Sequence, residues 1–141
     1  ELFKNKVLGS YLKLCGQIPV ARNTSSAAES LLPAKKYLDW EHCIGIYPEG
    51  TMPYDLEQLP IKSGAIRLSQ ETGVPIVVVG TWGAHELQRR GQRPKVKFRV
   101  RHDMVVTPAY KVDPDISIEQ AKKELAEKMK YATSLAKEKR G

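Results

Sequence analysis

The chain contains few of the residues on which metal, thiol and membrane-spanning chemistry depends. It has two cysteines and three histidines in 141 residues, and no apolar run approaches the roughly 18–20 residues of a membrane-spanning helix. Cys15 and Cys43 show no metal-ligand spacing, and neither has a His/Asp arrangement beside it. These absences argue against a metal site, a reactive thiol and a membrane span. They predict two reduced, buried thiols in a cytosolic chain.

Acidic residues are also scarce relative to basic ones. Lysine and arginine number 23 against 16 aspartates and glutamates, which gives a net charge of +7 and an isoelectric point near 9.4. Such an excess favours an anionic partner: a phosphate-bearing substrate, an anionic membrane surface or a nucleic acid. The remaining composition, 41% hydrophobic and 28% charged, is that of an ordinary soluble domain. The chain begins at Glu1 without a signal peptide, and we expect it to start inside a longer domain.

Apolar periodicity predicts four helices. Apolar residues recur at three- and four-residue intervals in each, and capping residues mark the ends. Pro33 is expected to kink or split the second helix, and Ser63 to cap the third. A capping box at Ser117 opens the last helix, which carries an apolar stripe and a solvated charged face. The predicted helices are residues 3–15 (ended by Gly16), 27–38, 64–71 and 117–139.

Apolar, β-branched runs between these helices predict strands. The run Val74–Val79 has no polar alternation, which is typical of a strand buried on both faces, and residues 80–94 are expected to form a loop. Lys95–Arg101 alternates cations with apolar residues, which predicts a half-buried strand with one basic face. A short strand is expected at Cys43–Tyr47. Alternating helices and strands predict one α/β domain over residues 1–141, with a mostly parallel central sheet flanked by helices.

The segment Tyr47–Thr51 follows a predicted strand, at the kind of edge where α/β folds build their sites. Pro48 stiffens the turn and Glu49 supplies a carboxylate. Gly50 and Thr51 offer backbone amides and a hydroxyl. Two interpretations are open on this local chemistry. The segment is either a tight turn in which Glu49 caps nearby amides, or part of a binding site.

Four segments around this turn resemble sequence blocks of the glycerol-phosphate and lysophosphatidic acid acyltransferases, the bacterial PlsC-like family. Residues 44–51 are similar to the block that usually reads Phe-Pro-Glu-Gly-Thr-Arg, and residues 61–65 to Phe-Lys-x-Gly-Ala. Residues 16–22 resemble the block that ends in arginine, and residues 73–79 resemble the buried strand opened by Val-Pro. The segments follow the family's order. The resemblance implies the fold of these enzymes, here N-terminally incomplete.

The resemblance also implies a function in phospholipid synthesis. Such enzymes move a fatty acyl group from acyl-CoA or acyl carrier protein to the hydroxyl of a lysophospholipid or glycerol phosphate, without a further cofactor. A His general base, oriented by an Asp, takes the hydroxyl proton. By the same resemblance Arg22 binds the acceptor phosphate, and Glu49, Gly50 and Thr51 line the acceptor pocket. Lys62 adds a cation where the start of the following helix already favours anions.

Two features depart from the family pattern. Met52 stands where the block usually has an arginine, so either another cation binds the phosphate or the acceptor differs. The His-x4-Asp block is absent, because His42, His85 and His102 lack an aspartate at the required spacing. Each of these histidines is expected to be structural or to lie at the surface. We therefore expect the catalytic pair upstream of Glu1 and no activity from this chain alone.

A cationic segment over residues 89–101 carries seven lysines and arginines and no acid. We expect it to contact anionic membrane headgroups, the CoA phosphate or acyl carrier protein, unless it is only a solvated strand face. A nucleic-acid-binding module is disfavoured, because no exposed aromatics are interleaved for base stacking. A catalytically inactive lipid-binding homologue is the other alternative. The enzyme interpretation predicts a cytoplasmic protein, peripheral at the cytoplasmic face of the membrane.

Overall fold

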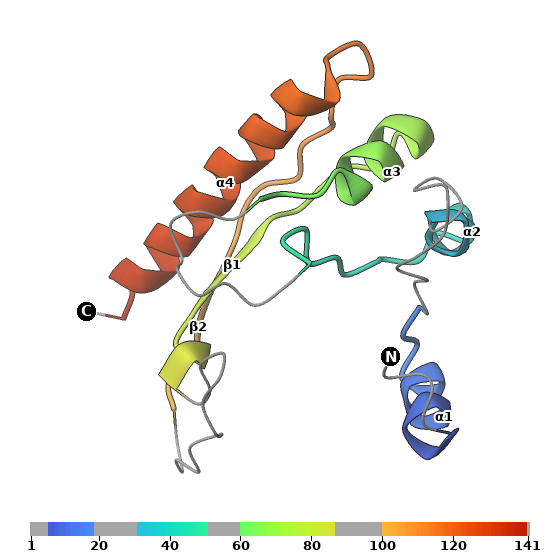
Figure 1. The fold of residues 1–141 in the computed structure, drawn as a ribbon. Coiled ribbons are helices and arrows are strands. Elements are labelled where there is room, and N and C mark those ends of the chain that lie inside the picture. Colours follow the sequence, from blue (N-terminus) through green and yellow to red (C-terminus); the bar gives the residue numbers. More distant parts are fainter. Residues whose placement is uncertain (1–5, 19–30, 51–59, 87–99, 141) are drawn as a thin grey trace. The chain divides into compact units, whose positions relative to one another are not determined.

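The computed structural model describes residues 6–18, 31–50, 60–86 and 100–140 (Figure 1). The chain divides into two compact units, unit 1 (Glu1–Ile44) and unit 2 (Gly45–Gly141). The assignment of residues 1–141 to one domain stays a prediction. Within the described ranges, no helix is both long enough and apolar enough to span a bilayer.

Unit 1 contains the helices α1 (Lys6–Leu14) and α2 (Leu32–Asp39). The predicted end of the first helix is confirmed, because Gly16 follows it with a φ of +71°. Pro33 lies in the first turn of α2, where a backbone N–H has no partner within the helix, so proline is tolerated there. Residues 27–30, the beginning of the predicted helix, lie outside the described residues, so the kink or split expected at Pro33 stays a prediction.

Two expectations, one about the cysteines and one about a strand, are wrong. Cys15 and Cys43 are free but exposed, because Cys15 follows the end of α1 and Cys43 lies outside any helix or strand. The strand expected over residues 43–47 is not formed, and Ile46 and Tyr47 are exposed. A strand needs a partner strand, and the described residues contain none that pairs with this segment.

In the described part of unit 2, the α-helices agree with the predicted ones, but the strands lie mostly at other residues than expected. The third predicted helix keeps its bounds within one residue and ends at Gly73, which has a φ of +70°. A strand occupies part of the loop predicted for residues 80–94, and another begins just after the predicted strand at residues 95–101, of which only 100 and 101 are described. The elements are α3 (Gly64–Thr72), β1 (Val79–Trp82), the short 3-10 helix η3 (Ala84–Glu86), β2 (Asp103–Val106) and α4 (Ile118–Glu138).

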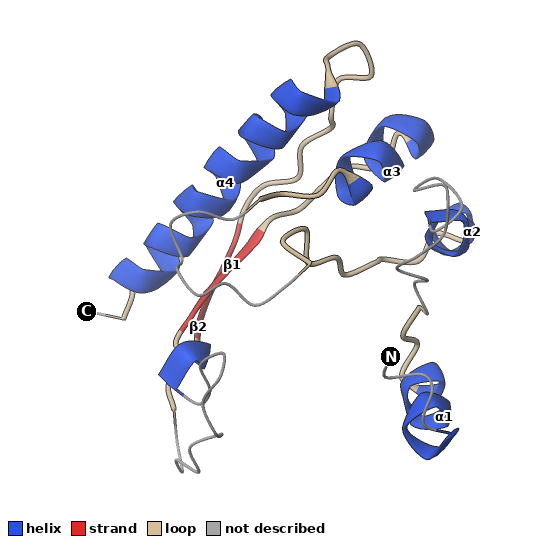
Figure 2. Cartoon of the chain, viewed as in Figure 1, coloured by secondary structure: helices blue, strands red, loops and turns tan. Residues whose placement is uncertain are grey.

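The strands β1 and β2 form one antiparallel pair, drawn in red in Figure 2. Val79 lies opposite Val106, and the bridge between Ile76 and Tyr110 continues the pairing. The mixture of helices and strands agrees with the coarse α/β expectation. The described residues contain no parallel pair, however, because β1 pairs with the strand that follows it along the chain, as antiparallel neighbours do.

Only one face of this sheet is covered by a described element. α4 packs on it, and Val78 and Gly80 are buried on that side. The side chains of Val77 and Val79 point to the other face and are 48% and 47% exposed. The prediction that residues 74–79 are buried on both faces is therefore wrong, because this β-branched run alternates between a covered and an open face.

Helix α4 agrees closely with its prediction, since it spans all but the ends of residues 117–139. The Ser117 hydroxyl accepts an amide hydrogen bond from the first turn at 3.2 Å, which confirms that residue as the cap. The stripe residues Ala121, Leu125 and Ala132 are buried in the core. α4 lies along both strands (Figure 1), and its backbone at Ala132 approaches so closely that a Cβ on Gly80 would collide with it.

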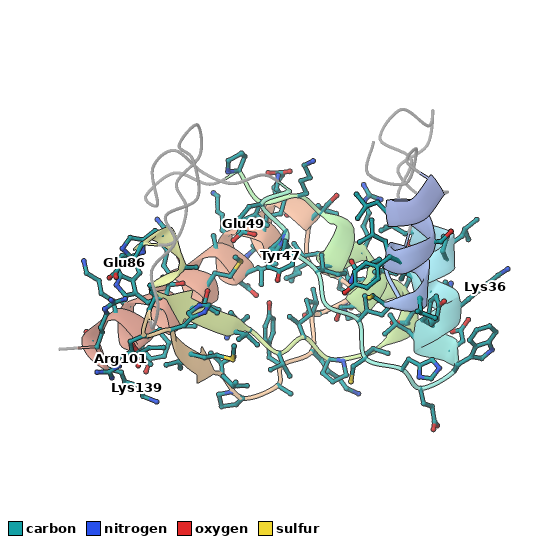
Figure 3. The ribbon with its side chains drawn as sticks, turned by 90° about the horizontal axis from the view of Figure 1, so that it is seen from below. Lys36, Tyr47, Glu49, Glu86, Arg101 and Lys139 are labelled. Atoms are coloured by element: carbon teal, nitrogen blue, oxygen red, sulfur yellow. The ribbon has the colours of Figure 1, made fainter. Side chains whose placement is uncertain are left out.

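A group of charged residues fixes the C-terminal end of α4 to the sheet, and we call it the clamp. Arg101 donates to the Lys139 carbonyl at 2.6 Å and pairs with Asp103 at 2.9 Å. Arg140 pairs with Glu86 and donates to the Arg101 carbonyl at 3.3 Å. Arg101 thus satisfies a carbonyl at the negative end of the helix dipole, and Arg140 holds the same end to the main chain just before β2. Figure 3 labels Arg101, Lys139 and Glu86 together at this end of unit 2.

Candidate functional site

The segment Tyr47–Gly50 forms a hydrogen-bonded tight turn. The Gly50 amide donates to the Tyr47 carbonyl at 3.1 Å, with Pro48 and Glu49 between them. Proline at the second position and glycine at the fourth are common in such turns. Gly50 has a φ of +63°, which favours glycine. Figure 3 shows Tyr47 and Glu49 well apart from the clamp, so unit 2 carries two separate groups of polar residues.

Lys62 lies against this turn through both its main chain and its side chain. Its amide donates to the Pro48 carbonyl at 2.8 Å. A Cβ added to Gly50 would lie 2.7 Å from Lys62 Nζ and 2.8 Å from Cε, so the lysine side chain crosses directly over Gly50. The preceding residue, Ile61, is buried in the core and fixes the backbone of this segment. The structure therefore brings the predicted site residues Gly50 and Lys62 into contact, with Glu49 beside them in the turn.

The charged groups at this turn have no protein partner among the described residues. Neither the Lys62 ammonium nor the Glu49 carboxylate makes an ion pair or a side-chain hydrogen bond there. The interpretation that Glu49 caps nearby amides therefore gains no support. Lys62 is exposed and Glu49 is partly buried. A free cation beside a free carboxylate can pair with an anion and accept hydrogen bonds from hydroxyl groups.

Helix α3 begins two residues after Lys62 and has no side-chain cap. Ser63 precedes it in a helical conformation, so its hydroxyl does not meet the first amides, and the predicted cap is wrong. That hydroxyl instead accepts from Arg67 Nε at 3.3 Å. The first turn of α3 contains no acid, and a helix start of this kind favours anions. Arg67 was not singled out from the sequence, although its position four residues after Ser63 places both on one helix face.

Three residues named from the sequence lie outside the described residues. They are Arg22, expected to bind the acceptor phosphate, Thr51 in the turn, and Met52 in place of the usual arginine. Their roles stay predictions.

The three histidines occupy separate positions. The His42 ring lies 5.9 Å from that of Tyr37 in unit 1, and the His85 ring lies 4.9 Å from that of Trp82 in unit 2. His102 is exposed and immediately precedes β2. Within the described ranges no carboxylate is hydrogen-bonded or ion-paired to a histidine. This agrees with structural or surface roles for all three.

Comparison with known proteins decides the family. The family model described as Acyltransferase matches residues 1–82, which is more than half of the chain. The chain belongs to the Acyltransferase family. The matched region contains the Pro48-Glu49-Gly50 turn and Lys62, and it confirms the resemblance to PlsC-like enzymes that these residues carried.

One curated relative of this acyltransferase chain is the 1-acyl-sn-glycerol-3-phosphate acyltransferase of Bacillus subtilis (strain 168). The two are 34% identical over 98 residues, which cover 70% of this chain and 48% of the relative. The chain thus spans about half the length of the curated relative it matches. No solved structure matches it.

Proposed function

We propose that this chain supplies the acceptor-binding part of an enzyme that moves a fatty acyl group to the hydroxyl of a lysophospholipid or glycerol phosphate. The observation that carries the proposal is the Lys62 side chain lying over Gly50, with an ammonium that no described residue pairs. Membership of the Acyltransferase family supports acyl transfer. Similarity to the Bacillus subtilis enzyme supports 1-acylglycerol 3-phosphate as the acceptor.

Each residue of the proposed site has a distinct chemical role. Lys62 pairs with the acceptor phosphate. For Arg22 the family resemblance implies phosphate binding, to which the planar fork of arginine is suited. Glu49 cannot favour a phosphate directly, so it accepts hydrogen bonds from glycerol hydroxyls. Gly50 admits the Lys62 side chain, and Thr51 adds a hydroxyl. Fixing the acceptor hydroxyl against the acyl thioester removes orientational freedom that the reaction otherwise has to lose.

Acyl transfer also requires a general base. A base takes the proton of the acceptor hydroxyl, the hydroxyl oxygen attacks the thioester carbonyl, and the thiol leaves with a proton as the new ester forms. Residues 1–141 contain no His-x4-Asp pair to perform this step. We propose that His42, His85 and His102 do not replace it, and that residues 1–141 bind the acceptor without turning it over.

The substrates favour a position at a membrane. A lysophospholipid resides in a bilayer, and the net charge of +7 favours an anionic surface. We therefore propose peripheral association with the cytoplasmic face of the membrane, with acyl-CoA or acyl carrier protein as donor. We also propose that the complete catalytic domain has a mostly parallel sheet, in which β1 and β2 form an antiparallel edge.

A binding titration tests the acceptor site. Residues 1–141 are titrated with a short-chain 1-acylglycerol 3-phosphate below its micelle concentration, and the backbone amide signals are followed by NMR. The proposal expects saturable shifts at Gly50, Lys62 and Ser63, and none when glycerol replaces the phosphate ester. The absence of saturable shifts at these residues would contradict it.

An activity measurement tests the assignment of the histidines. Residues 1–141 are incubated with a labelled acyl thioester and the same acceptor, and the labelled lipid product is quantified. We expect no product above the uncatalysed background. Enzymatic turnover that disappears on changing one of the three histidines would show that this chain contains its own general base.

A further inference from the structure

The three described arginines of unit 2 have different partners. Arg101 is paired with Asp103, and Arg140 with Glu86, so both charges are neutralised inside the clamp. Arg67 is exposed, and among the described residues no carboxylate is ion-paired with it. An arginine without a carboxylate partner is available to an anionic ligand.

The contacts of Arg67 hold its side chain toward the start of α3. Its Nε donates to the Ser63 hydroxyl at 3.3 Å, and its amide donates to the Ser63 carbonyl at 2.9 Å. The hydrogen bond uses Nε and leaves the two terminal nitrogens of the guanidinium for other acceptors. Ser63 directly follows Lys62, whose ammonium lies over Gly50. Lys62 and Arg67, two cations without acidic partners among the described residues, are therefore both next to Ser63.

We propose that Arg67 determines which headgroup the acceptor site takes, by binding a phosphate monoester together with Lys62. The inference rests on the acceptor-binding role proposed above and goes further by assigning to Arg67 the selectivity between phosphate monoesters and phosphodiesters. A monoester carries nearly two negative charges at neutral pH, and two cations match it. A phosphodiester carries one charge and gains less from the second cation.

The sequence supplies a reason for a second cation at this position. The family block usually ends in arginine after its threonine, but here residue 52 is methionine, which cannot pair with a phosphate. Arg67 provides a guanidinium from α3 instead. Its planar fork binds two phosphate oxygens at once, which a lysine at the same position does not do.

A selectivity measurement tests this role. The dissociation constants of a hexanoylglycerol 3-phosphate and of its methyl phosphodiester are measured for the wild-type chain, R67Q, R67K and the control K111Q. Lys111 is an exposed lysine of unit 2 that belongs neither to the turn nor to α3. Thermal unfolding of each variant checks that it is folded.

The expected result is a loss of selectivity confined to Arg67. R67Q weakens monoester binding about tenfold and diester binding little, because a charged hydrogen bond is lost only from the dianion. R67K, which keeps the charge and loses the fork, falls between R67Q and wild type. K111Q keeps the wild-type ratio.

Two results would overturn the inference, and they are distinguishable. In the first, the wild-type chain binds the monoester, and R67Q either keeps the wild-type selectivity or weakens the binding of both esters equally. Arg67 is then only a helix-surface residue. If the wild-type chain binds neither ester, the proposed acceptor site itself fails, and the role of Arg67 fails with it.

Discussion

Among the glycines of unit 2 that other groups approach closely, Gly80 and Gly50 are approached by groups that differ in kind. Gly80 faces the main chain of α4 at Ala132, which cannot move without displacing the helix. Gly50 faces the far end of the Lys62 side chain, which is flexible. The first contact is a packing constraint and the second places a functional group. A substitution at Gly80 should therefore change the free energy of unfolding, whereas a substitution at Gly50 should also change ligand affinity.

The charges near these two glycines also differ: those near Gly80 are paired within the protein, and the one beside Gly50 is not, within the described ranges. In the clamp beside β1, Arg101 and Arg140 are each paired with a carboxylate, and Arg101 also donates to the Lys139 carbonyl at the end of α4. Beside Gly50, Lys62 has no partner among the described residues. Charges that the protein neutralises contribute to the fold. A charge held in place without a partner contributes little to stability and is available to a ligand.

The largest expected effect is that of Gly80→Ala. The new Cβ collides with the α4 backbone and forces the helix off the sheet, which should lower the free energy of unfolding by about 3 kcal/mol. Thermal unfolding monitored by circular dichroism would show the melting temperature lowered by about 10 °C or more. Gly45→Ala is the matched control, because no atom lies near a Cβ at that position. Equal effects of the two changes would contradict the close approach of α4.

Gly50→Ala should affect both stability and binding. Alanine at a φ of +63° costs about 1–2 kcal/mol, and its Cβ displaces the Lys62 ammonium, which should weaken acceptor binding about tenfold. Gly73→Ala is the control, since its φ is +70° and no atom lies near its Cβ. That variant should lose similar stability and keep its affinity. A similar loss of affinity in both variants would mean that the Lys62 contact is irrelevant to binding.

Glu86→Gln should cause a smaller loss, confined to stability. It removes the ion pair with Arg140, in which both side chains are partly buried, and should cost about 1 kcal/mol. Chemical denaturation by urea measures the change. The exposed pair of Glu119 with Lys122 is the comparison, and Glu119→Gln should have almost no effect. If Glu86→Gln also reduced acceptor affinity, the clamp would affect binding at the turn, and the two regions would not be independent.

The smallest expected effect is that of Tyr110→Phe. Burial, with a smaller contribution from Glu124, raises the pKa of the Tyr110 phenol above 10, and its hydroxyl has no described hydrogen-bond partner. Stability from the protonated phenol is complete below about pH 10 and is lost as pH rises through the raised pKa, because the unfolded chain ionises first. The variant should match or slightly exceed wild type at pH 7 and lose less stability above pH 10. Tyr131→Phe, at an exposed position, should leave the wild-type pH dependence unchanged.

Local sequence signals predicted much of this structure. The cap at Ser117 and the apolar stripe of α4 predicted that helix within one residue at each end, and Gly16 and Gly73 marked two helix ends. The contact of Lys62 with the turn depends on a main-chain hydrogen bond to Pro48, which no pattern in the sequence specifies. The resemblance to the family blocks nevertheless selected both Lys62 and the turn, and their role in binding stays a prediction.

Strand pairing and face coverage were not predictable in the same way. A continuous run such as Val74–Val79 shows that side chains are apolar, but not whether one or two layers cover them. The pairing of β1 with β2 depends on contacts between residues far apart in sequence, such as Val79 with Val106. The conformation of Ser63 depends on the turn that precedes α3, so its expected role as a cap could not be checked from residue type alone.

The affinity of the acceptor for Lys62 variants tests the central claim most directly. The dissociation constant of a short-chain 1-acylglycerol 3-phosphate is measured by calorimetry for wild type, Lys62→Met and Lys111→Met, which remove the same charge from two exposed positions of unit 2. We expect Lys62→Met to weaken binding about tenfold or more with an unchanged melting temperature, and Lys111→Met to keep the wild-type affinity. Equal affinity in all three proteins would contradict it.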